Sequence, residues 1–214
     1  MKPCQNLLTA TALCFGYGMP NSALLFDDLR VALPPGITLV CGDESSGKTS
    51  LLRLLAGELA LPVDGGELQV GNFNPAHNRP AYRRQVAWLD AQSTALDAQT
   101  ARQIFSNPPS HLAACDADRL HAHIAGLYLE PHLDKSLTML SSGTRRKVLL
   151  AAVLAAQAPV VLLDQPFMAL DRPSIDYLLA VLASAAAAGA PCQAWVVADY
   201  QPPPGVPLAG TVLL

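Results

Sequence analysis

The stretch that decides the fold is Gly42-Asp43-Glu44-Ser45-Ser46-Gly47-Lys48-Thr49, which matches the pattern G-x-x-x-x-G-K-[ST] at every fixed position. Residues 37–41, in front of it, form a short apolar run with β-branched residues, which predicts a buried strand. Residues 49–59, behind it, carry leucines at the spacing of a helix with one apolar face. A strand, a glycine-rich loop and a helix in this order form a loop that binds phosphate groups.

Each part of this phosphate loop has a chemical reason. The glycines let the backbone N–H groups turn toward phosphate oxygens, and the helix N-terminus adds partial positive charge. The pattern assigns Lys48 to the β- and γ-phosphates and the Thr49 hydroxyl to Mg²⁺. Asp43 and Glu44 are unusual beside an anion: they weaken binding if they face it, and solvent screens them if they do not. The residues expected to bind the nucleotide here are Gly42, Asp43, Glu44, Ser45, Ser46, Gly47, Lys48, Thr49 and Ser50.

The rest of the chain alternates strands with helices. Apolar runs bounded by turn residues predict further strands at residues 7–15, 24–31, 67–70, 160–163, 195–198 and 210–214. Periodic stretches predict helices at residues 143–156 and 174–188, with Gly189 as the stop signal of the second. Between about residues 94 and 139 the strand pattern disappears, which predicts an inserted, mainly helical lobe. The alternation predicts an α/β fold with a mainly parallel sheet, and 214 residues fit a single domain, residues 1–214.

Composition limits the classes of function. Only 14% of the residues are charged, the net charge is -3, and no basic cluster stands out beyond Arg145-Arg146-Lys147, so we expect no nucleic-acid partner. Five irregularly spaced cysteines predict neither a disulfide framework nor a zinc site, which fits a reducing cytosol. The most apolar region, residues 148–163, is short and is interrupted by Gln157 and Pro159, so no transmembrane helix is expected.

Short motifs follow the phosphate loop in a fixed order. Leu140-Ser141-Ser142-Gly143-Thr144 resembles the signature Leu-Ser-Gly-Gly-Gln at three of five positions, Val160 to Asp164 resembles a Walker B strand, and Ala169-Leu170-Asp171 resembles a D-loop. Together with Tyr17 and Gln92, these motifs make the sequence similar to the ABC transporter ATPase family over nearly the whole chain. The resemblance implies a P-loop NTPase core with a mainly parallel sheet, N-terminal antiparallel strands and an inserted helical subdomain.

The resemblance also implies roles for these residues, with ATP and Mg²⁺ as cofactors. Tyr17 is placed to stack on adenine, whereas Thr49, Gln92 and Asp164 are placed to hold Mg²⁺. The signature residues are expected to bind the γ-phosphate held by a second cassette, so that two cassettes enclose ATP; they are Ser141, Ser142 and Gly143. Each role has a structural alternative: Tyr17 packs locally, Gln92 lies in a surface loop, Asp164 caps a strand, and a signature serine caps a helix.

Two positions depart from the family pattern in a way that bears on hydrolysis. Gln165 stands where the family has a glutamate that polarises the attacking water, and an amide cannot accept its proton. Losing a general base typically costs about 10²- to 10⁴-fold in rate. Asp199 or Tyr200, depending on the alignment, stands where the family has a switch histidine. We therefore expect Lys48, Gln165 and Tyr200 to act in catalysis, with ATP binding retained and hydrolysis weakened.

The short length and the stretches Trp88-Leu89-Asp90-Ala91-Gln92 and Asp164-Gln165-Pro166-Phe167 are most similar to the small haem-exporter ATPase of cytochrome c maturation. The resemblance implies a separate transmembrane permease subunit as partner and a place at the cytoplasmic face of the inner membrane. It leaves open a homodimer or a heterodimer with another ABC ATPase. An alternative is a regulatory cassette that binds ATP, barely hydrolyses it and pairs with an active cassette. The acidic net charge disfavours a nucleic-acid-linked ABC ATPase.

Overall fold

The computed structural model describes residues 6–18, 24–187 and 193–214. The predicted helix end at Gly189 lies outside these residues. Within the described ranges, no helix is both long enough and apolar enough to cross a membrane.

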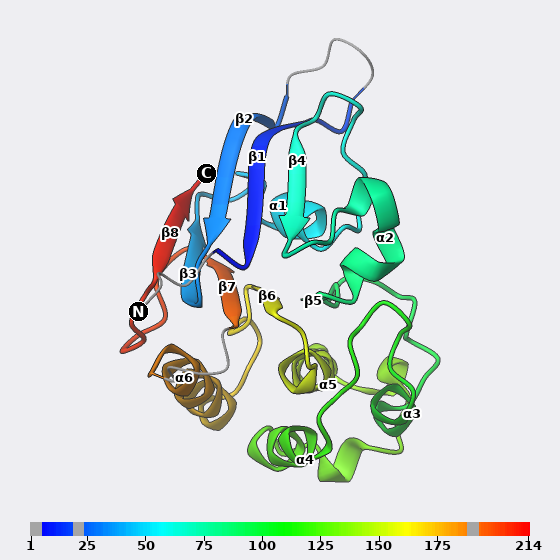
Figure 1. Cartoon of the computed structure of the whole chain (residues 1–214). Coiled ribbons are helices and arrows are strands. Elements are labelled where there is room, and N and C mark those ends of the chain that lie inside the picture. Colours follow the sequence, from blue (N-terminus) through cyan, green and yellow to red (C-terminus); the bar gives the residue numbers. More distant parts are fainter. Residues whose placement is uncertain (1–5, 19–23, 188–192) are drawn as a thin grey trace.

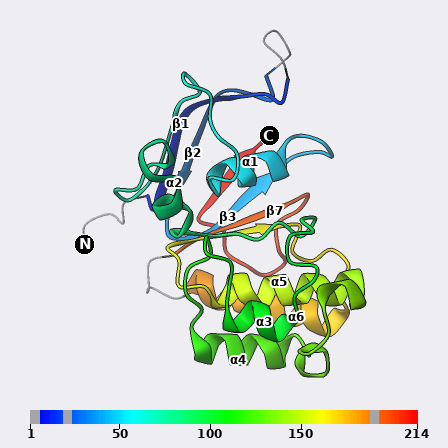
Figure 2. The same ribbon diagram turned by 90° about the vertical axis from the view of Figure 1, so that its right-hand side faces the viewer.

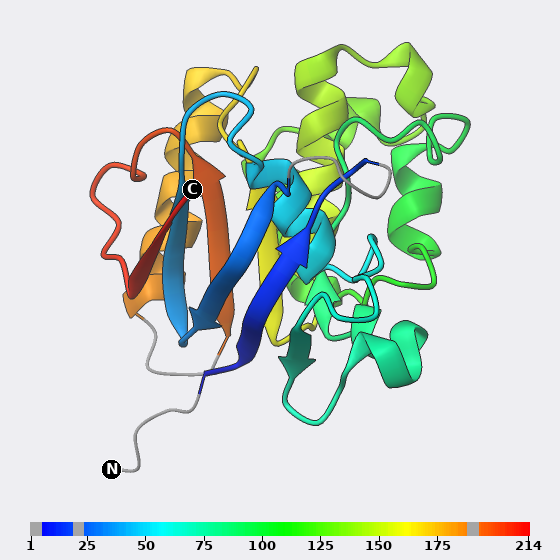
Figure 3. The ribbon, with the colours of Figure 1, turned by 90° about the horizontal axis from the view of Figure 1, so that it is seen from above.

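The strands form two separate sheets (Figures 1 and 3). The antiparallel sheet has the strand order β2-β1-β4, and the parallel sheet has the order β5-β6-β7-β3-β8. The predicted α/β class, with a mainly parallel sheet and N-terminal antiparallel strands, is confirmed. The strands span β1 Leu8–Phe15, β2 Phe26–Leu33, β3 Gly36–Cys41, β4 Glu67–Val70, β5 Val86–Ala87, β6 Val160–Asp164, β7 Ala194–Asp199 and β8 Gly210–Leu213.

Helices cover both faces of the parallel sheet. Figure 2 shows α3, α4, α5 and α6 gathered on one side of this sheet, with α1 and the antiparallel sheet on the other side. The α-helices span α1 Lys48–Leu55, α2 Pro75–Arg83, α3 Ala101–Ser106, α4 Ala117–Gly126, α5 Ser142–Ala155 and α6 Arg172–Ala187. Two short 3₁₀ turns, Glu130–His132 and Leu137–Met139, lie between α4 and α5, in the stretch of residues 94–139 that also contains α3 and α4.

The inner parallel strands have unbroken apolar sequences because both faces of the sheet are buried, each against a different set of elements. In β6, Val160 and Leu162 point into the core shared with α1 and the antiparallel sheet. Val161 and Leu163 point to the opposite face, into the core shared with α3, α4, α5 and α6. Successive side chains on a strand alternate between faces, so a sheet covered on both sides needs apolar residues at every position.

The structure differs from the sequence prediction mainly in the bounds of two elements and in two elements that were not predicted. Helix α1 ends at Leu55 instead of residue 59, because Gly57 adopts φ +65° and turns the chain. Strand β2 lies two residues later than predicted. Helix α2 was not predicted, since it contains Pro80 and a non-helical kink at Asn78. Strand β5 was not predicted either, because it is only two residues long.

The contact between α4 and α6 contains a buried histidine. His123 is 8% exposed, and its Nδ1 lies 2.9 Å from the hydroxyl of Tyr177. The Tyr177 hydroxyl also donates a hydrogen bond to the carbonyl of Ala122 at 3.1 Å. Burial lowers the pKa of His123, because the apolar surroundings disfavour the imidazolium form. Neutral His123 is therefore part of the packing between these helices.

We predict that the folded state loses stability as pH falls below about 6.5, the pKa of an unfolded histidine. The unfolded chain takes up a proton there while folded His123 stays neutral, so this contribution is present above that pH and is lost below it. The urea midpoints of the wild type and His123→Gln at about pH 7 and about pH 5 measure it. The variant should lose less stability over this range, and an equal loss in both proteins would contradict the prediction.

Candidate nucleotide-binding site

The phosphate loop between β3 and α1 has two positions that only glycine fits. Gly47 adopts φ +100°, and a Cβ there would lie 3.0 Å from the ring of Phe26. A Cβ at Gly42 would lie 2.4 Å from Oγ of Ser46. These two glycines therefore allow the tight curl that the sequence pattern predicts.

Lys48 is a buried cation whose partners are all neutral. It is 6% exposed, and its Nζ donates hydrogen bonds to the carbonyls of Gly42 at 2.6 Å and Asp43 at 2.7 Å. Nζ also lies 4.3 Å from the centre of the Tyr200 ring, within range of a cation–π contact. Carbonyl dipoles and an aromatic face attract the ammonium group without cancelling its charge. That charge remains available to an anionic ligand.

Asp164, the last residue of β6, has an unused oxygen beside the phosphate loop. Its Oδ2 accepts a hydrogen bond from Thr49 Oγ1 at 2.6 Å, whereas its Oδ1 is buried and has no hydrogen-bond partner among the described residues. Burial raises the pKa of Asp164, opposed by the Thr49 hydrogen bond and the charge of Arg146. A strand-end cap alone leaves this oxygen unexplained, whereas a bound cation would satisfy it.

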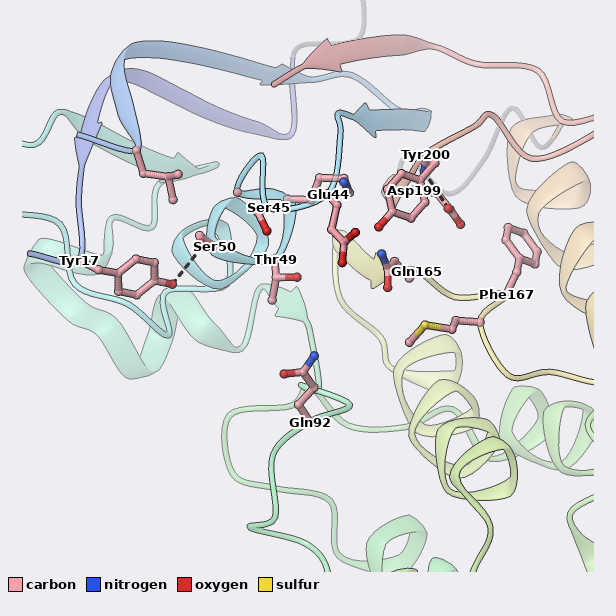
Figure 4. Close-up of a pocket in the computed structure, with 14 residues that line it drawn as sticks. Tyr17, Glu44, Ser45, Thr49, Ser50, Gln92, Gln165, Phe167, Asp199 and Tyr200 are labelled. Carbon is pink, nitrogen blue, oxygen red and sulfur yellow. Dashed lines mark hydrogen bonds between the residues drawn. The ribbon is translucent and has the colours of Figure 1, made fainter. Parts of the chain in front are cut away.

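Gln92 completes a set of oxygen donors around this point. Its exposed side chain lines the same cleft and points toward Thr49 (Figure 4). Its backbone N–H donates to Asp90 Oδ1 at 2.8 Å. The Thr49 hydroxyl, an Asp164 oxygen and the Gln92 amide oxygen fit Mg²⁺, which prefers oxygen ligands and takes the others from phosphate and water. Gln92 is thus both a surface-loop residue and a cleft residue.

These groups lie around one open cleft of about 800 Å³, shown in Figure 4. This volume lies within the range of roughly 300 to 1,000 Å³ typical of small-molecule sites. Tyr17 lies at one end, and Gln165 and Tyr200 lie at the other. The lining residues are Tyr17, Leu25, Glu44, Ser45, Gly47, Lys48, Thr49, Ser50, Gln92, Gln165, Phe167, Met168, Asp199 and Tyr200.

Gln165 lines the cleft and has a backbone conformation that is rare for a residue other than glycine. Its φ is +43°, and its N–H donates to the carbonyl of Ala198 at 2.8 Å. The structure also distinguishes Asp199, the last residue of β7, from Tyr200, which follows it. Tyr200 contacts Lys48 with its ring, whereas Asp199 turns back and accepts the N–H of Tyr200 on Oδ1 at 2.8 Å.

The two acidic residues of the phosphate loop differ in position. Glu44 lines the cleft, so its carboxylate is on the side of the ligand. Asp43 is exposed and is absent from the lining, although its carbonyl accepts from Lys48. Solvent screens Asp43, whereas Glu44 is a negative charge that a bound phosphate must tolerate.

Tyr17 packs locally and is also accessible from the cleft, so its position agrees with both roles considered for it, local packing and stacking on adenine. Its ring packs edge-on against Phe15 with centroids 5.0 Å apart, and its hydroxyl donates to Ser50 Oγ at 3.0 Å. It nevertheless remains 63% exposed at the end of the cleft. Local packing therefore fixes the ring and leaves it free to meet a planar base.

The signature residues are absent from the lining of this cleft. Ser141 caps α5, with its Oγ accepting the N–H of Thr144 at 3.2 Å, so the capping alternative describes its contact within the chain. Ser142 is exposed at the first turn of α5. A Cβ on Gly143 would lie 2.4 Å from the carbonyl of Ala169, so the D-loop requires glycine there. The remaining predicted residues, Gly42, Asp43, Ser46 and Asp164, adjoin the cleft without lining it.

The sequence missed the apolar part of the lining. Leu25 comes from the segment before β2, and Phe167 and Met168 come from the turn after β6. Phe167 belongs to the motif Asp-Gln-Pro-Phe, which was the only signal for it. Leu25 and Met168 reach the cleft through tertiary packing, and no local sequence pattern predicts that they line it.

Comparison with known proteins agrees with this geometry. The sequence model of a family described as ABC transporter matches residues 26–168. The chain belongs to the ABC transporter family. It is an ATP-binding cassette of that family, as the order of its motifs predicts.

Two curated relatives show the extent of the similarity. This ABC cassette is 32% identical over 191 residues to the cobalt import ATP-binding protein CbiO of Rhodobacter capsulatus, covering 86% of the chain and 67% of the relative. It is 35% identical over 180 residues to the cytochrome c biogenesis ATP-binding export protein CcmA of Pseudomonas savastanoi, covering 83% of the chain and 82% of the relative. The predicted similarity to the haem-exporter ATPase is confirmed at the level of sequence.

Solved structures share the fold of this cassette. An ATP-binding subunit of an ABC transporter superimposes with a TM-score of 0.77 at 20% identity, covering 91% of this chain and 79% of that one. MJ0796, a bacterial ABC transporter cassette solved as a dimer, superimposes with a TM-score of 0.73 at 18% identity, covering 91% of this chain and 88% of that one.

We predict that Asp164→Asn removes most of the Mg²⁺ enhancement of ATP affinity and does not weaken ATP binding in EDTA, where the Asp164 charge only repels the phosphates. The amide keeps the size of the side chain but loses the charge, and one lost contact to a charged group is worth about tenfold or more in affinity. Titration of a fluorescent ATP analogue with and without Mg²⁺ measures this ratio.

Asp134→Asn is the matched control, because Asp134 is 76% exposed and pairs only with Arg102 on the surface. An unchanged Mg²⁺ enhancement in Asp164→Asn would remove Asp164 from the metal site.

Proposed function

We propose that this cassette binds Mg²⁺ and ATP, dimerises around the nucleotide and drives or gates a separate membrane permease, with slow hydrolysis. The observation that carries the proposal is the convergence of three groups on one cleft. Lys48, a buried cation, and Gln165, an amide at the position expected for a general base, line the cleft. Asp164, which has an unused oxygen, adjoins the cleft through its hydrogen bond with Thr49. Lys48 and Asp164 favour binding of a metal–phosphate ligand, and Gln165 disfavours its rapid cleavage.

The nucleotide fits the cleft in one direction. The backbone of the phosphate loop, Lys48 and the start of α1 supply positive potential for the phosphates. Tyr17, at the other end, offers an exposed aromatic face for the base. Thr49, Gln92 and Asp164 lie between them as donors for Mg²⁺.

The exposed start of α5 supports a dimer. Ser142, in the first turn of this helix, is exposed and does not line its own cleft, and a helix N-terminus attracts anions. In a dimer these groups would reach the γ-phosphate bound by the partner cassette. MJ0796, which shares the fold, is a dimeric cassette. We propose a homodimer or a heterodimer with another ABC ATPase.

Slow hydrolysis follows from the groups at the phosphate end of the cleft. Gln165 can orient a water but cannot take its proton. Tyr200 places an aromatic ring, not an imidazole, against Lys48. The carboxylates that line the cleft are Glu44 and Asp199, and both lie outside the position after the Walker B aspartate. This arrangement also favours the second candidate function, a regulatory cassette that pairs with an active one.

The partner and the location follow from the relatives. One is named for cobalt import and the other for export in cytochrome c biogenesis, so the direction and the cargo differ between them. Both are ATP-binding proteins of transport systems, so we propose a separate permease and a place at the cytoplasmic face of the inner membrane. Arg145, Arg146 and Lys147 are engaged within the chain, which supports the proposal that nucleic acid is not a partner.

We predict that Gln165→Glu raises steady-state ATP hydrolysis by about 10²- to 10⁴-fold, because it restores a general base. The wild type should hydrolyse slowly while binding ATP normally, which a phosphate-release assay and an ATP titration of the same samples show. Lys48→Ala in both backgrounds is the control, since it should abolish ATP binding.

Ordinary turnover by the wild type would remove the slow-hydrolysis part of the proposal. If Glu44→Gln then abolished that turnover, Glu44 would be the base. If neither the wild type nor Gln165→Glu bound ATP, the proposed function itself would be wrong.

A further inference from the structure

The only basic cluster noted in the sequence, Arg145-Arg146-Lys147, lies in the first turns of α5. Its three side chains contact three different segments: the loop around Gln92, the turn at Gln165 and the D-loop. Lys147 is 8% exposed and its Nζ donates to Asp171 Oδ2 at 2.7 Å, which lowers the pKa of Asp171 to about 2 and ties α5 to the D-loop. The two arginines contact backbone carbonyls instead.

Arg145 holds the loop that carries Gln92. Its guanidinium donates to the carbonyls of Ala91 and Ser93, the residues on either side of Gln92. It also forms an ion pair with Asp97, with Nη2 2.9 Å from Oδ1. The Arg145 side chain is only 19% exposed, so this ion pair is better shielded from solvent than a surface pair.

Arg146 holds the turn that carries Gln165. Its Nη1 donates to the carbonyl of Asp164 at 3.2 Å and to the carbonyl of Gln165 at 2.5 Å. Burial lowers the pKa of Arg146, and the charges of Asp164 and Asp199 oppose this effect. Gln165 has φ +43°, a conformation that a non-glycine residue keeps only when its surroundings hold it there.

The two glutamines face the same cleft, and adjacent residues of one helix hold their loops. A second contact fixes the Gln92 loop from α1: Arg53 Nη2 lies 2.6 Å from Asp90 Oδ2, and Asp90 Oδ1 accepts the N–H of Gln92. Arg145 uses two nitrogens of its planar guanidinium, Nη1 and Nη2, to reach the carbonyls of Ala91 and Ser93, a fork that a lysine lacks. Arg146 reaches both of its carbonyls through Nη1 alone.

We propose that Arg145 and Arg146 are positioning residues that fix the side chains of Gln92 and Gln165 through the carbonyls of their loops. The start of α5 thereby fixes the positions of both side chains: Gln92, which is expected to bind the metal, and Gln165, which is expected to orient the attacking water. The positioning role is argued only from the contacts of Arg145 and Arg146 in the structure. The effect of these residues on ATP turnover rests on the proposed function.

Hydrogen–deuterium exchange of the full chain without nucleotide tests the positioning directly. Arg145→Lys should make the amides of residues 90–97 exchange about tenfold faster and leave residues 165–168 unchanged, the fold-change expected for one lost charge-assisted hydrogen bond. Arg146→Gln, which removes the charged donor to the carbonyls of Asp164 and Gln165, should give the opposite pattern. Arg102→Lys is the control, because Arg102 is 58% exposed and pairs with Asp134 at the surface.

Faster exchange in both segments with either variant would indicate general loosening and would overturn the proposal, as would no change in either. If Arg145→Lys does not fold, Asp97→Asn should raise exchange in residues 90–97 alone, because it removes the carboxylate that orients Arg145. If Arg146→Gln does not fold, Arg146→Met takes its place with the same expectation for residues 165–168.

Turnover gives a second readout in the Gln165→Glu background, where the rate is expected to be measurable. Arg146→Gln should lower kcat about tenfold or more with little change in KM, because a displaced group costs rate while the phosphate loop still binds ATP. An equal change in kcat and KM, or none, would overturn this part. If the background itself is silent, the proposed function is at fault, and the exchange result still decides the positioning role.

Discussion

The hydrogen bond between Thr49 and Asp164 is the contact on which the arrangement of the site depends. Strands β3 and β6 are not neighbours, because β7 lies between them. The register places Cys41 beside Asp199 and Asp164 beside Ala198, so all three strands end at the same level. The phosphate loop, the Gln165 turn and Tyr200 therefore leave the sheet at one edge, as expected for ligand sites in parallel sheets.

Three charged groups at this edge form no ion pair among the residues that the structure describes. In that part of the chain Lys48 has neutral partners, Asp164 has one buried oxygen without a hydrogen-bond partner, and Glu44 adds a negative charge to the cleft. A phosphate alone would satisfy Lys48 but would face Glu44 and Asp164. A phosphate accompanied by a divalent cation offsets both, which is the electrostatic reason for expecting the two ligands together.

The sequence predicted the parts of this structure that have a local cause. The phosphate loop, the buried strands and α5 follow from glycine placement, apolar runs and periodicity, and the structure confirms them within a few residues. Helix α2 escaped prediction because Pro80 and Asn78 break its pattern, and it forms where Asn74 caps it and Tyr82 is fully buried. The apolar side of the cleft was missed for a related reason: Leu25 and Met168 meet there only once β2 and β6 are packed.

The cluster Arg145-Arg146-Lys147 shows why composition alone misleads about surfaces. As sequence, it is the one basic patch of an acidic chain and the only candidate for contact with a polyanion. In the fold, each side chain is turned inward, toward the Gln92 loop, the Gln165 turn and the D-loop. The start of α5 carries Ser142 one turn from these residues. In the proposed dimer, one end of a single helix would therefore meet the partner's nucleotide and also hold the glutamines of its own site. Because a helix moves as a rigid body, occupancy of one site would then be felt at the other without any further connecting element.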